Sequence, residues 1–86
     1  MAIEKLSVRQ VKAARALLGW SQSDLAKASG VSHPTVMRLE AAEGALGGRA
    51  STGDAIRVAL EAAGIVFLPE NGEGPGVRLA KPETGA

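Results

Sequence analysis

The sequence contains no cysteine, and its single histidine is His33. Without cysteine the chain forms no disulfide, no thiolate metal site and no covalent intermediate on a cysteine. One histidine with neither a cysteine nor a second histidine provides no zinc ligand set, so we expect no metal and no cofactor. Because His33 also has no nucleophile or acid partner in a recognisable pattern, we expect no enzymatic activity.

Aromatic residues are nearly absent as well, being limited to Trp20 and Phe67. Abundant alanine with so few bulky side chains favours short helices packed closely over a sheet-rich core. No apolar run approaches the ~20 residues that a membrane helix needs, and the first residues lack the hydrophobic region of a signal peptide. We therefore expect a mainly helical domain in the cytoplasm, without membrane contact.

The net charge is only +1, but the charges are unevenly divided along the chain. Residues 1–49 carry seven basic and four acidic side chains, whereas residues 50–86 carry three basic and five acidic ones. An anionic partner is therefore expected to meet the N-terminal half. The alternative is a solvated surface of mixed charge without a ligand.

Capping residues predict the first two helices. Ser7 opens a capping-box pattern, in which a serine oxygen and a glutamine three residues later satisfy each other's backbone N–H groups. This pattern predicts a helix over residues 8–18, ended by Gly19. Ser21 begins a second helix, and Gly30 ends it.

Two more helices follow. Ser32 can cap a helix over residues 33–42, in which Pro34 is tolerated because first-turn N–H groups have no acceptor within the helix. Three glycines within residues 43–50 predict a surface loop. A fourth helix is then expected over residues 51–64, opened by a serine and ended by a glycine.

The C-terminal part changes character. Residues 65–68 and 77–79 are β-prone and are separated by turn residues, which predicts a hairpin. A lone hairpin is only marginally stable in water, so it must pack on the helices or pair with another copy. We interpret residues 65–80 as a candidate dimerisation element, with an N-terminal tail at 1–6 and a disordered tail at 81–86. The side chains predicted to make the dimer contact are Ile65, Val66, Phe67, Leu68, Val77 and Leu79.

The stretch that begins at Gln22 has the spacing of a helix-turn-helix unit. Counted from Gln22, Ala26 stands at the fifth position, Gly30 at the ninth and Val36 at the fifteenth. A small residue lets the two helices approach, a glycine takes the left-handed turn, and an apolar residue packs between the inner faces. Residues 7–64 are therefore expected to form a helix-turn-helix domain.

These motifs give the chain a resemblance to a known family. Residues 19–26 (GWSQSDLA), 30–32 (GVS) and 35–40 (TVMRLE) resemble the lambda-repressor-like, Cro-type helix-turn-helix (Xre) family of bacterial and phage regulators, and the resemblance covers residues 8–64. It implies a compact four-helix domain, usually dimeric, whose second motif helix enters the DNA major groove. It also implies a bacterial or phage-type protein associated with the nucleoid. One departure is the loop before the fourth helix, where Arg49 is the only cation.

Two charged residues on inner helix faces predict an ion pair. Arg15 shares a helical stripe with Val11 and Leu18, and Glu40 lies beside Leu39. A charge at a buried position is costly unless it is paired, so we predict that Arg15 and Glu40 meet and join the first helix to the third. The alternative is that Arg15 extends to solvent.

The outer face of the third helix is predicted to contact DNA. Arg38 can donate two hydrogen bonds to a guanine edge, whereas Pro34 and Met37 offer only apolar contact and His33 can donate or accept. The residues expected to contact bases are His33, Pro34, Met37 and Arg38. The residues expected to contact phosphates are Gln22, Ser32, Thr35, Lys27 and Arg49.

Plainer roles are open for several of these residues. Gln22 and Ser32 can serve as ordinary helix caps without a ligand. Arg38 can be a solvated surface cation. Trp20 is more consistent with packing between the first two helices than with stacking on a base.

The sequence thus indicates a sequence-specific double-stranded DNA-binding transcriptional regulator, a homodimeric repressor that inserts helix 33–42 into the major groove. A dimer is expected because one small domain buries too little surface on DNA for tight binding. Two copies that contact two DNA half-sites ~34 Å apart bury enough. The alternative is a protein-binding adaptor on the same fold, antitoxin-like or an antiactivator, acting through the β-prone tail. Low net charge and few loop cations favour that alternative.

Overall fold

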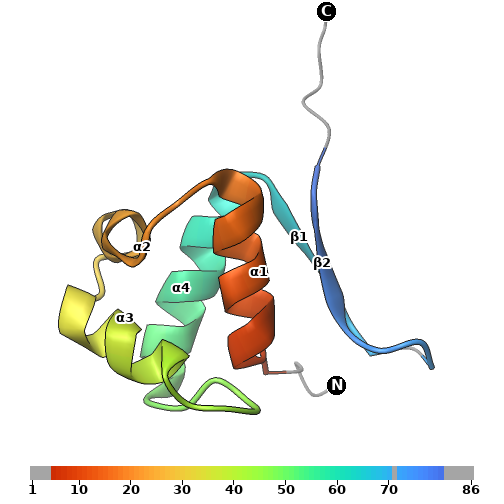
Figure 1. The fold of residues 1–86 in the computed structure, drawn as a ribbon, viewed down its shortest axis with the longest axis horizontal. Coiled ribbons are helices and arrows are strands. Elements are labelled where there is room, and N and C mark those ends of the chain that lie inside the picture. Colours follow the sequence, from red (N-terminus) through yellow and green to blue (C-terminus); the bar gives the residue numbers. More distant parts are fainter. Residues whose placement is uncertain (1–4, 71, 81–86) are drawn as a thin grey trace, which may run out of the picture.

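The computed structural model describes residues 5–70 and 72–80. They form four helices followed by a two-stranded hairpin, so the predicted mainly helical fold is confirmed (Figure 1). The outermost residues of the two predicted tails, 1–4 and 81–86, lie outside the described residues. No helix in the described ranges has the length and apolarity needed to cross a membrane. The elements are α1 (Val8–Leu18), α2 (Gln22–Ser29), α3 (His33–Glu40), α4 (Ala50–Ala62), β1 (Ile65–Leu68) and β2 (Gly76–Leu79).

The starts of α1 and α2 follow the predicted caps. Ser7 Oγ accepts from the Gln10 N–H (3.0 Å), while the Gln10 side-chain oxygen accepts from the Ser7 N–H (2.9 Å). Ser21 makes the same reciprocal pair at the start of α2. Both helices end at glycines with left-handed backbone, Gly19 and Gly30. Each cap satisfies N–H groups that have no partner within the helix.

The third helix is shorter than predicted. It ends at Glu40 rather than at residue 42. The Ala41 N–H bonds to the carbonyl of Met37 (3.1 Å) and also to that of Arg38 (3.3 Å), which tightens the last turn. Residues 41 and 42 therefore lie between the end of α3 and the predicted loop at residues 43–50.

The fourth helix begins at Ala50, one residue before the predicted start at Ser51. Arg49 occupies the N-cap position without a side-chain hydrogen bond, and its carbonyl accepts from the Thr52 N–H (3.0 Å) and the Gly53 N–H (3.2 Å). Exposed first-turn N–H groups can bond to water, so this start needs no serine cap. Alanine, the best helix former, extends the helix to residue 50.

The loop between α3 and α4 is not the plain surface loop that its glycines predict. Leu46 is 5% exposed and belongs to the core, as does Leu6, which we assigned to the N-terminal tail. The Leu46 N–H donates to the Leu6 carbonyl (2.8 Å), and Ser7 forms a β-bridge with Ala45. The segment before α1 and this loop therefore hold each other in place.

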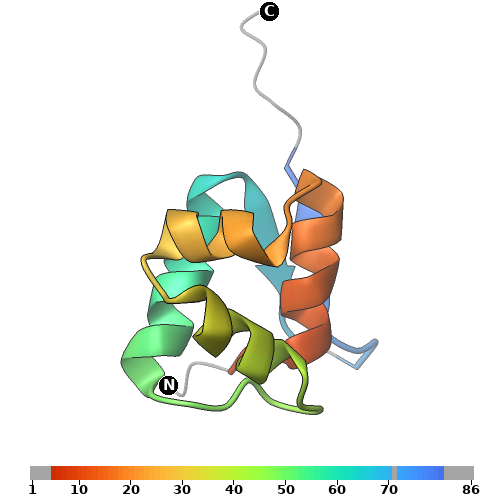
Figure 2. The ribbon, with the colours of Figure 1, turned by 60° about the vertical axis from the view of Figure 1, so that its left-hand side comes forward.

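The core lies where the inner faces of the helices meet the start of β1. Figure 2 shows α2 and α3 stacked between α1 on one side and α4 on the other. Trp20 is partly buried against this core, which agrees with a packing role. The largest side chains that are fully buried are Leu25, Ile56, Leu60, Val8, Val11 and Val36.

The hairpin stands beside α1, on the side of the molecule opposite α2 and α3 (Figure 1). Its strands pair antiparallel, with Ile65 opposite Leu79 and Phe67 opposite Val77. Ile65 is 3% exposed, and Phe67 and Val77 pack against the core. The hairpin therefore packs on its own helices, as a two-stranded sheet must to be stable without another partner.

This packing narrows the side chains that can meet a second copy. Ile65 is buried in the chain's own core and is unavailable, contrary to its inclusion among the dimer contacts. Phe67, Val77 and Leu68 are half-buried, whereas Val66 (38% exposed) and Leu79 (41%) remain accessible.

Gln10 fastens the hairpin to α1. The residue is 9% exposed, and its side-chain amide donates to the Gly76 carbonyl (3.1 Å) and, more weakly, to the Leu68 carbonyl (3.5 Å). These two carbonyls belong to the paired residues at the turn end of the hairpin. One glutamine therefore caps α1 through its oxygen and holds the hairpin through its nitrogen.

Candidate nucleic-acid interface

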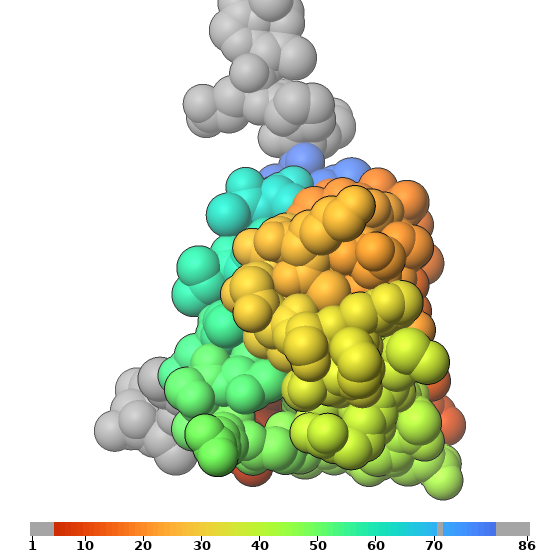
Figure 3. Space-filling view, turned by 90° about the vertical axis from the view of Figure 1, so that its left-hand side faces the viewer, coloured from red at the N-terminus to blue at the C-terminus, as the bar shows by residue number. Residues whose placement is uncertain are grey.

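The corner between α2 and α3 has the geometry that the spacing predicts. Gly30 has φ +77° and donates its N–H to the Ala26 carbonyl (2.9 Å). Ala26 and Val36 are buried on the facing sides of the two helices. In the space-filling view α3 lies directly below α2 and forms part of the outer surface (Figure 3). The glycine turn thus presents α3 at the surface while its inner side is packed.

Ser32 caps α3 and is already occupied by that task. Its Oγ accepts from the Thr35 N–H (3.3 Å) and donates to the Thr35 hydroxyl (2.9 Å). Pro34 lies in the first turn, where its missing N–H costs no helical hydrogen bond. A phosphate contact by Ser32 or Thr35 therefore has to be added to this cap or replace part of it.

The side chains on the outer face of α3 are free of the core. His33, Pro34 and Arg38 are exposed, and Met37 is 50% exposed. All four residues predicted to contact bases therefore lie at the surface, on the one helix whose inner side is fixed by buried Val36.

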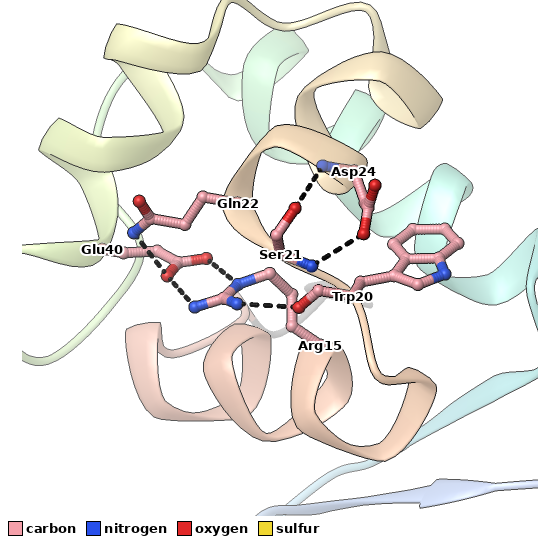
Figure 4. Close-up of polar contacts among 6 residues, drawn as sticks. All are labelled: Arg15, Trp20, Ser21, Gln22, Asp24 and Glu40. Atoms are coloured by element: carbon pink, nitrogen blue, oxygen red, sulfur yellow. Dashed lines mark hydrogen bonds and ion pairs between the residues drawn. The ribbon is translucent and has the colours of Figure 1, made fainter.

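Behind this face, Arg15 and Glu40 meet directly (Figure 4). The Arg15 Nε donates to Glu40 Oε2 (2.8 Å), and Nη2 donates to Oε1 (2.6 Å). Arg15 Nη1 also donates to the Trp20 carbonyl (3.0 Å), in the turn before α2. The Glu40 side chain is 2% exposed and that of Arg15 is 18% exposed. The pair joins α1 to the end of α3, and the third bond ties both to the start of α2.

The charges of this pair are mutually stabilised. Burial raises the pKa of Glu40, but hydrogen bonds from Arg15 and Gln22, with the positive charges of Arg15 and Lys12, outweigh it and hold the pKa below the ordinary value. The hydrogen bond to Glu40 raises the pKa of Arg15 against the opposing effect of burial. Both groups are therefore ionised at neutral pH.

The side chain of Gln22, which is predicted to contact a phosphate, already makes a hydrogen bond to another residue of the protein. Its Nε2 donates to Glu40 Oε1 (3.1 Å), at the edge of the Arg15 pair (Figure 4). The second amide hydrogen of Nε2 is the donor left for an outside anion. Gln22 is not a helix cap, because Ser21 caps α2, and its side chain instead links α2 to Glu40 on α3.

The predicted phosphate contacts outside α3 lie at two places. Lys27 is exposed on α2, and Arg49 is exposed at the start of α4. Arg49 lies next to α3, because Arg38 and Arg49 line the same groove of about 340 Å³ together with Thr35 and Thr52. The groove thus places cations from two helices close together.

Two residues that sequence reasoning missed adjoin this region. Thr52 lines the groove just described, and Lys5 lines a neighbouring depression with Arg49. Lys5 reaches this position through the bridge between Ser7 and Ala45. No local sequence signal marks such a pairing between distant residues, so Lys5 looks like part of a tail. Among residues 5–70 and 72–80 no group of three or more His, Cys, Asp or Glu side chains is placed to hold a metal ion.

Comparison with known proteins agrees with this geometry. The family model described as helix-turn-helix matches residues 11–49, from α1 to the N-cap of α4. No curated protein matches the chain. The matched segment contains both helices of the corner, the glycine turn and the Arg15–Glu40 pair. Residues 11–49 are therefore a helix-turn-helix domain of the Cro-type (Xre) family, a class of domain that implies DNA binding and transcriptional regulation.

Proposed function

We propose that the protein is a sequence-specific, double-stranded DNA-binding transcriptional repressor that acts as a homodimer in a bacterial or phage setting, at the nucleoid. The observation that carries the proposal is the outer face of α3, which is exposed while its inner side is packed and joined to α1 by the Arg15–Glu40 pair. A helix held this way can enter the major groove without first becoming ordered.

The base contacts are assigned to the tip and outer face of α3. Arg38 donates to guanine O6 and N7, and His33, near the helix start, contacts a base edge as donor or acceptor. Pro34 and Met37 make apolar contacts, for which a thymine methyl group is the fitting partner. Because two of the four contacts are apolar, Arg38 and His33 supply most of the discrimination between base pairs.

The phosphate contacts flank α3. Arg49 and Lys27 supply charge from α4 and α2, and the hydroxyls of Ser32 and Thr35 lie at the first turn of α3. Gln22 contributes its remaining amide hydrogen while its other one stays on Glu40. Such contacts fix the orientation on the duplex and carry no base information themselves.

The dimer contact is assigned to the hairpin. Val66 and Leu79 are exposed apolar side chains on its two strands. The unpaired edges of a two-stranded sheet also offer backbone groups to a second copy. Two copies joined in this way would present two α3 helices to two half-sites.

Selection of bound sequences from a random duplex pool tests the proposal directly. We expect a two-fold related pair of half-sites about one helical turn apart, ~34 Å. Affinity for the selected duplex should fall steeply as salt rises, because bound phosphates release counterions. If no duplex, selected or random, is bound at low salt, the proposal fails.

A second candidate is a protein-binding adaptor, antitoxin-like or an antiactivator. The exposed apolar side chains of the hairpin and the net charge of only +1 favour it. The salt experiment separates the two functions, since an adaptor of this kind needs no affinity for duplex DNA.

A further inference from the structure

The loop between α3 and α4 has few cations of its own. Across residues 41–49 the only basic side chain is Arg49, against one acidic residue, Glu43. A phosphate that lies against this part of the domain therefore needs positive charge from another segment.

The segment before α1 supplies such a charge. Leu6 is buried, its carbonyl accepts from the Leu46 N–H (2.8 Å), and Gly44 accepts from the Val8 N–H (2.9 Å). These bonds begin immediately after Lys5, so its backbone is held against the loop. Lys5 is exposed and reaches the depression that contains Arg49.

This depression has an apolar floor and a charged rim. It holds about 270 Å³, with Leu6 and Leu46 among its lining residues. Lys5, Arg49 and Arg57 line it as cations and Asp54 as the one acid. A net positive rim beside apolar atoms favours an anion, because the apolar floor limits solvent screening.

The three cations differ in how much charge they can offer. Arg57 donates to Glu61 (3.2 Å) and lies 5.4 Å from the centre of the Phe67 ring, so its charge is already engaged. Lys5 and Arg49 form no ion pair with any carboxylate of residues 5–70 and 72–80. Their charge is thus the part of the rim that is available to a ligand.

The depression is continuous with the groove beside α3. Gly48 and Arg49 line both. In the space-filling view, a hollow opens between the start of α4 and α3, and N-terminal atoms, in red, are visible within it (Figure 3). The hollow is on the same face of the molecule as α2 and α3.

We propose that Lys5 and Arg49 together hold a backbone phosphate of the DNA, beside the base pairs contacted by α3. Lys5 thereby replaces the cations that the loop lacks. The assignment deepens the proposed function and rests on it. It adds Lys5, a residue outside the matched helix-turn-helix segment, to the DNA-binding surface.

The test uses the full chain with Lys5→Gln, Arg49→Gln and the double substitution. Binding to the selected duplex and to a random duplex is measured between 50 and 200 mM salt, a range over which phosphate contacts are resolved. The double variant should lower the slope of log K against log salt by about 0.9, the amount for one phosphate, and each single variant should lower it by part of that amount. Near 0.1 M salt, the loss in the double variant corresponds to roughly eight-fold weaker binding to both duplexes. The matched control is Arg9→Gln, which removes one exposed charge from α1 and should leave the slope unchanged.

A Lys5→Gln variant with the slope of the unmodified protein would overturn the proposal. That outcome differs from failure of the proposed function, in which the unmodified protein itself binds no duplex. Inorganic phosphate, added to the protein without DNA and followed by NMR, provides the second measurement. We expect amide shifts at Lys5 and Arg49. If these shifts appear while both DNA slopes stay unchanged, the depression binds a free anion and the assignment to DNA is wrong.

Discussion

Arg15 and Glu40, which are 25 residues apart in the chain, are joined by two parallel hydrogen bonds of 2.8 and 2.6 Å. The guanidinium fork matches the carboxylate in this geometry, which gives direction as well as attraction. Because Glu40 also accepts from Gln22 and Arg15 also donates to the Trp20 carbonyl, three helices converge on one ion pair. The orientation of α3 relative to α1 therefore depends on it.

Glu40→Ala should destabilise the fold by about 3 kcal/mol, because it leaves the partly buried Arg15 charge and the Gln22 amide without their acceptor. Urea unfolding monitored by circular dichroism measures the loss. The double variant with Arg15→Met should recover part of it, since an apolar side chain needs no partner. A loss below about 1 kcal/mol for Glu40→Ala would mean that the pair behaves as a solvated one.

Acid should weaken this link in a defined range. The pKa of Glu40 is held below its ordinary value of 4.5, so its ionised form stabilises the folded state above that pH. The contribution is lost as pH falls through the lowered pKa. The gap in unfolding free energy between the unmodified protein and Glu40→Gln should therefore be full at pH 7 and shrink below about pH 4.5. Glu43→Gln, in the exposed part of the loop, is the control and should open no comparable gap at pH 7.

A substitution at Gln10 can separate its two roles, which are capping α1 and holding the hairpin. Gln10→Glu keeps the oxygen that accepts from the Ser7 N–H but sets a carboxylate against the Leu68 and Gly76 carbonyls. In the Gln10→Glu variant, the backbone amides of the hairpin should exchange with solvent faster by about ten-fold or more, the equivalent of roughly 1.5 kcal/mol. The first turn of α1 should stay protected. Gln10→Ala should loosen both regions. Equal exchange at the hairpin in Gln10→Glu and the unmodified protein would show that the amide bonds do not hold it.

Arg38→Ala should cost about 1–3 kcal/mol in binding to the selected duplex and relax the preference at one base pair. The expected mechanism is loss of a bidentate contact with guanine, so random duplex should lose much less. Competition binding on a set of single-base variants of the site measures both effects. Arg9→Ala, which removes an exposed arginine from α1, serves as the control. Uniform weakening across all sequences would instead identify Arg38 as a phosphate contact.

The dimer assignment is tested with two exposed valines. Val66→Lys places a charge on β1 of the hairpin, and Val58→Lys places the same charge on α4, where Val58 is 63% exposed. Sedimentation velocity should show a monomer for Val66→Lys and a dimer for Val58→Lys, because a buried unpaired charge is costly only inside the interface. A dimer in both variants removes the hairpin from the interface.

The features that the sequence predicts well are those encoded by residues close to one another. The caps at Ser7 and Ser21 and the turn at Gly30 need only three or four neighbouring residues. The Arg15–Glu40 contact is longer in range, but it follows from two charges that interrupt otherwise apolar helix faces.

The features that escaped prediction depend on pairing between distant segments. Leu46 lies among glycines in a stretch without periodicity, and its burial depends on the bond to Leu6. The hydrogen bond from Gln10 to the Gly76 carbonyl could not be predicted either, because the capping box is a sufficient reason for a glutamine at this position. Lys5 shares this property: its place beside Arg49 follows from the bridge at Ser7 and Ala45 rather than from its own neighbours.

The amide of Gln10 has a consequence for how such a protein can change its targets. In the proposed hairpin-joined dimer, the angle at which the hairpin lies against α1 would set the distance between the two α3 helices. Gln10, which bonds the hairpin to α1, is not among the residues predicted to contact bases. In the proposed dimer, half-site separation and base preference would then be set by different residues, so one could change in evolution while the other is kept.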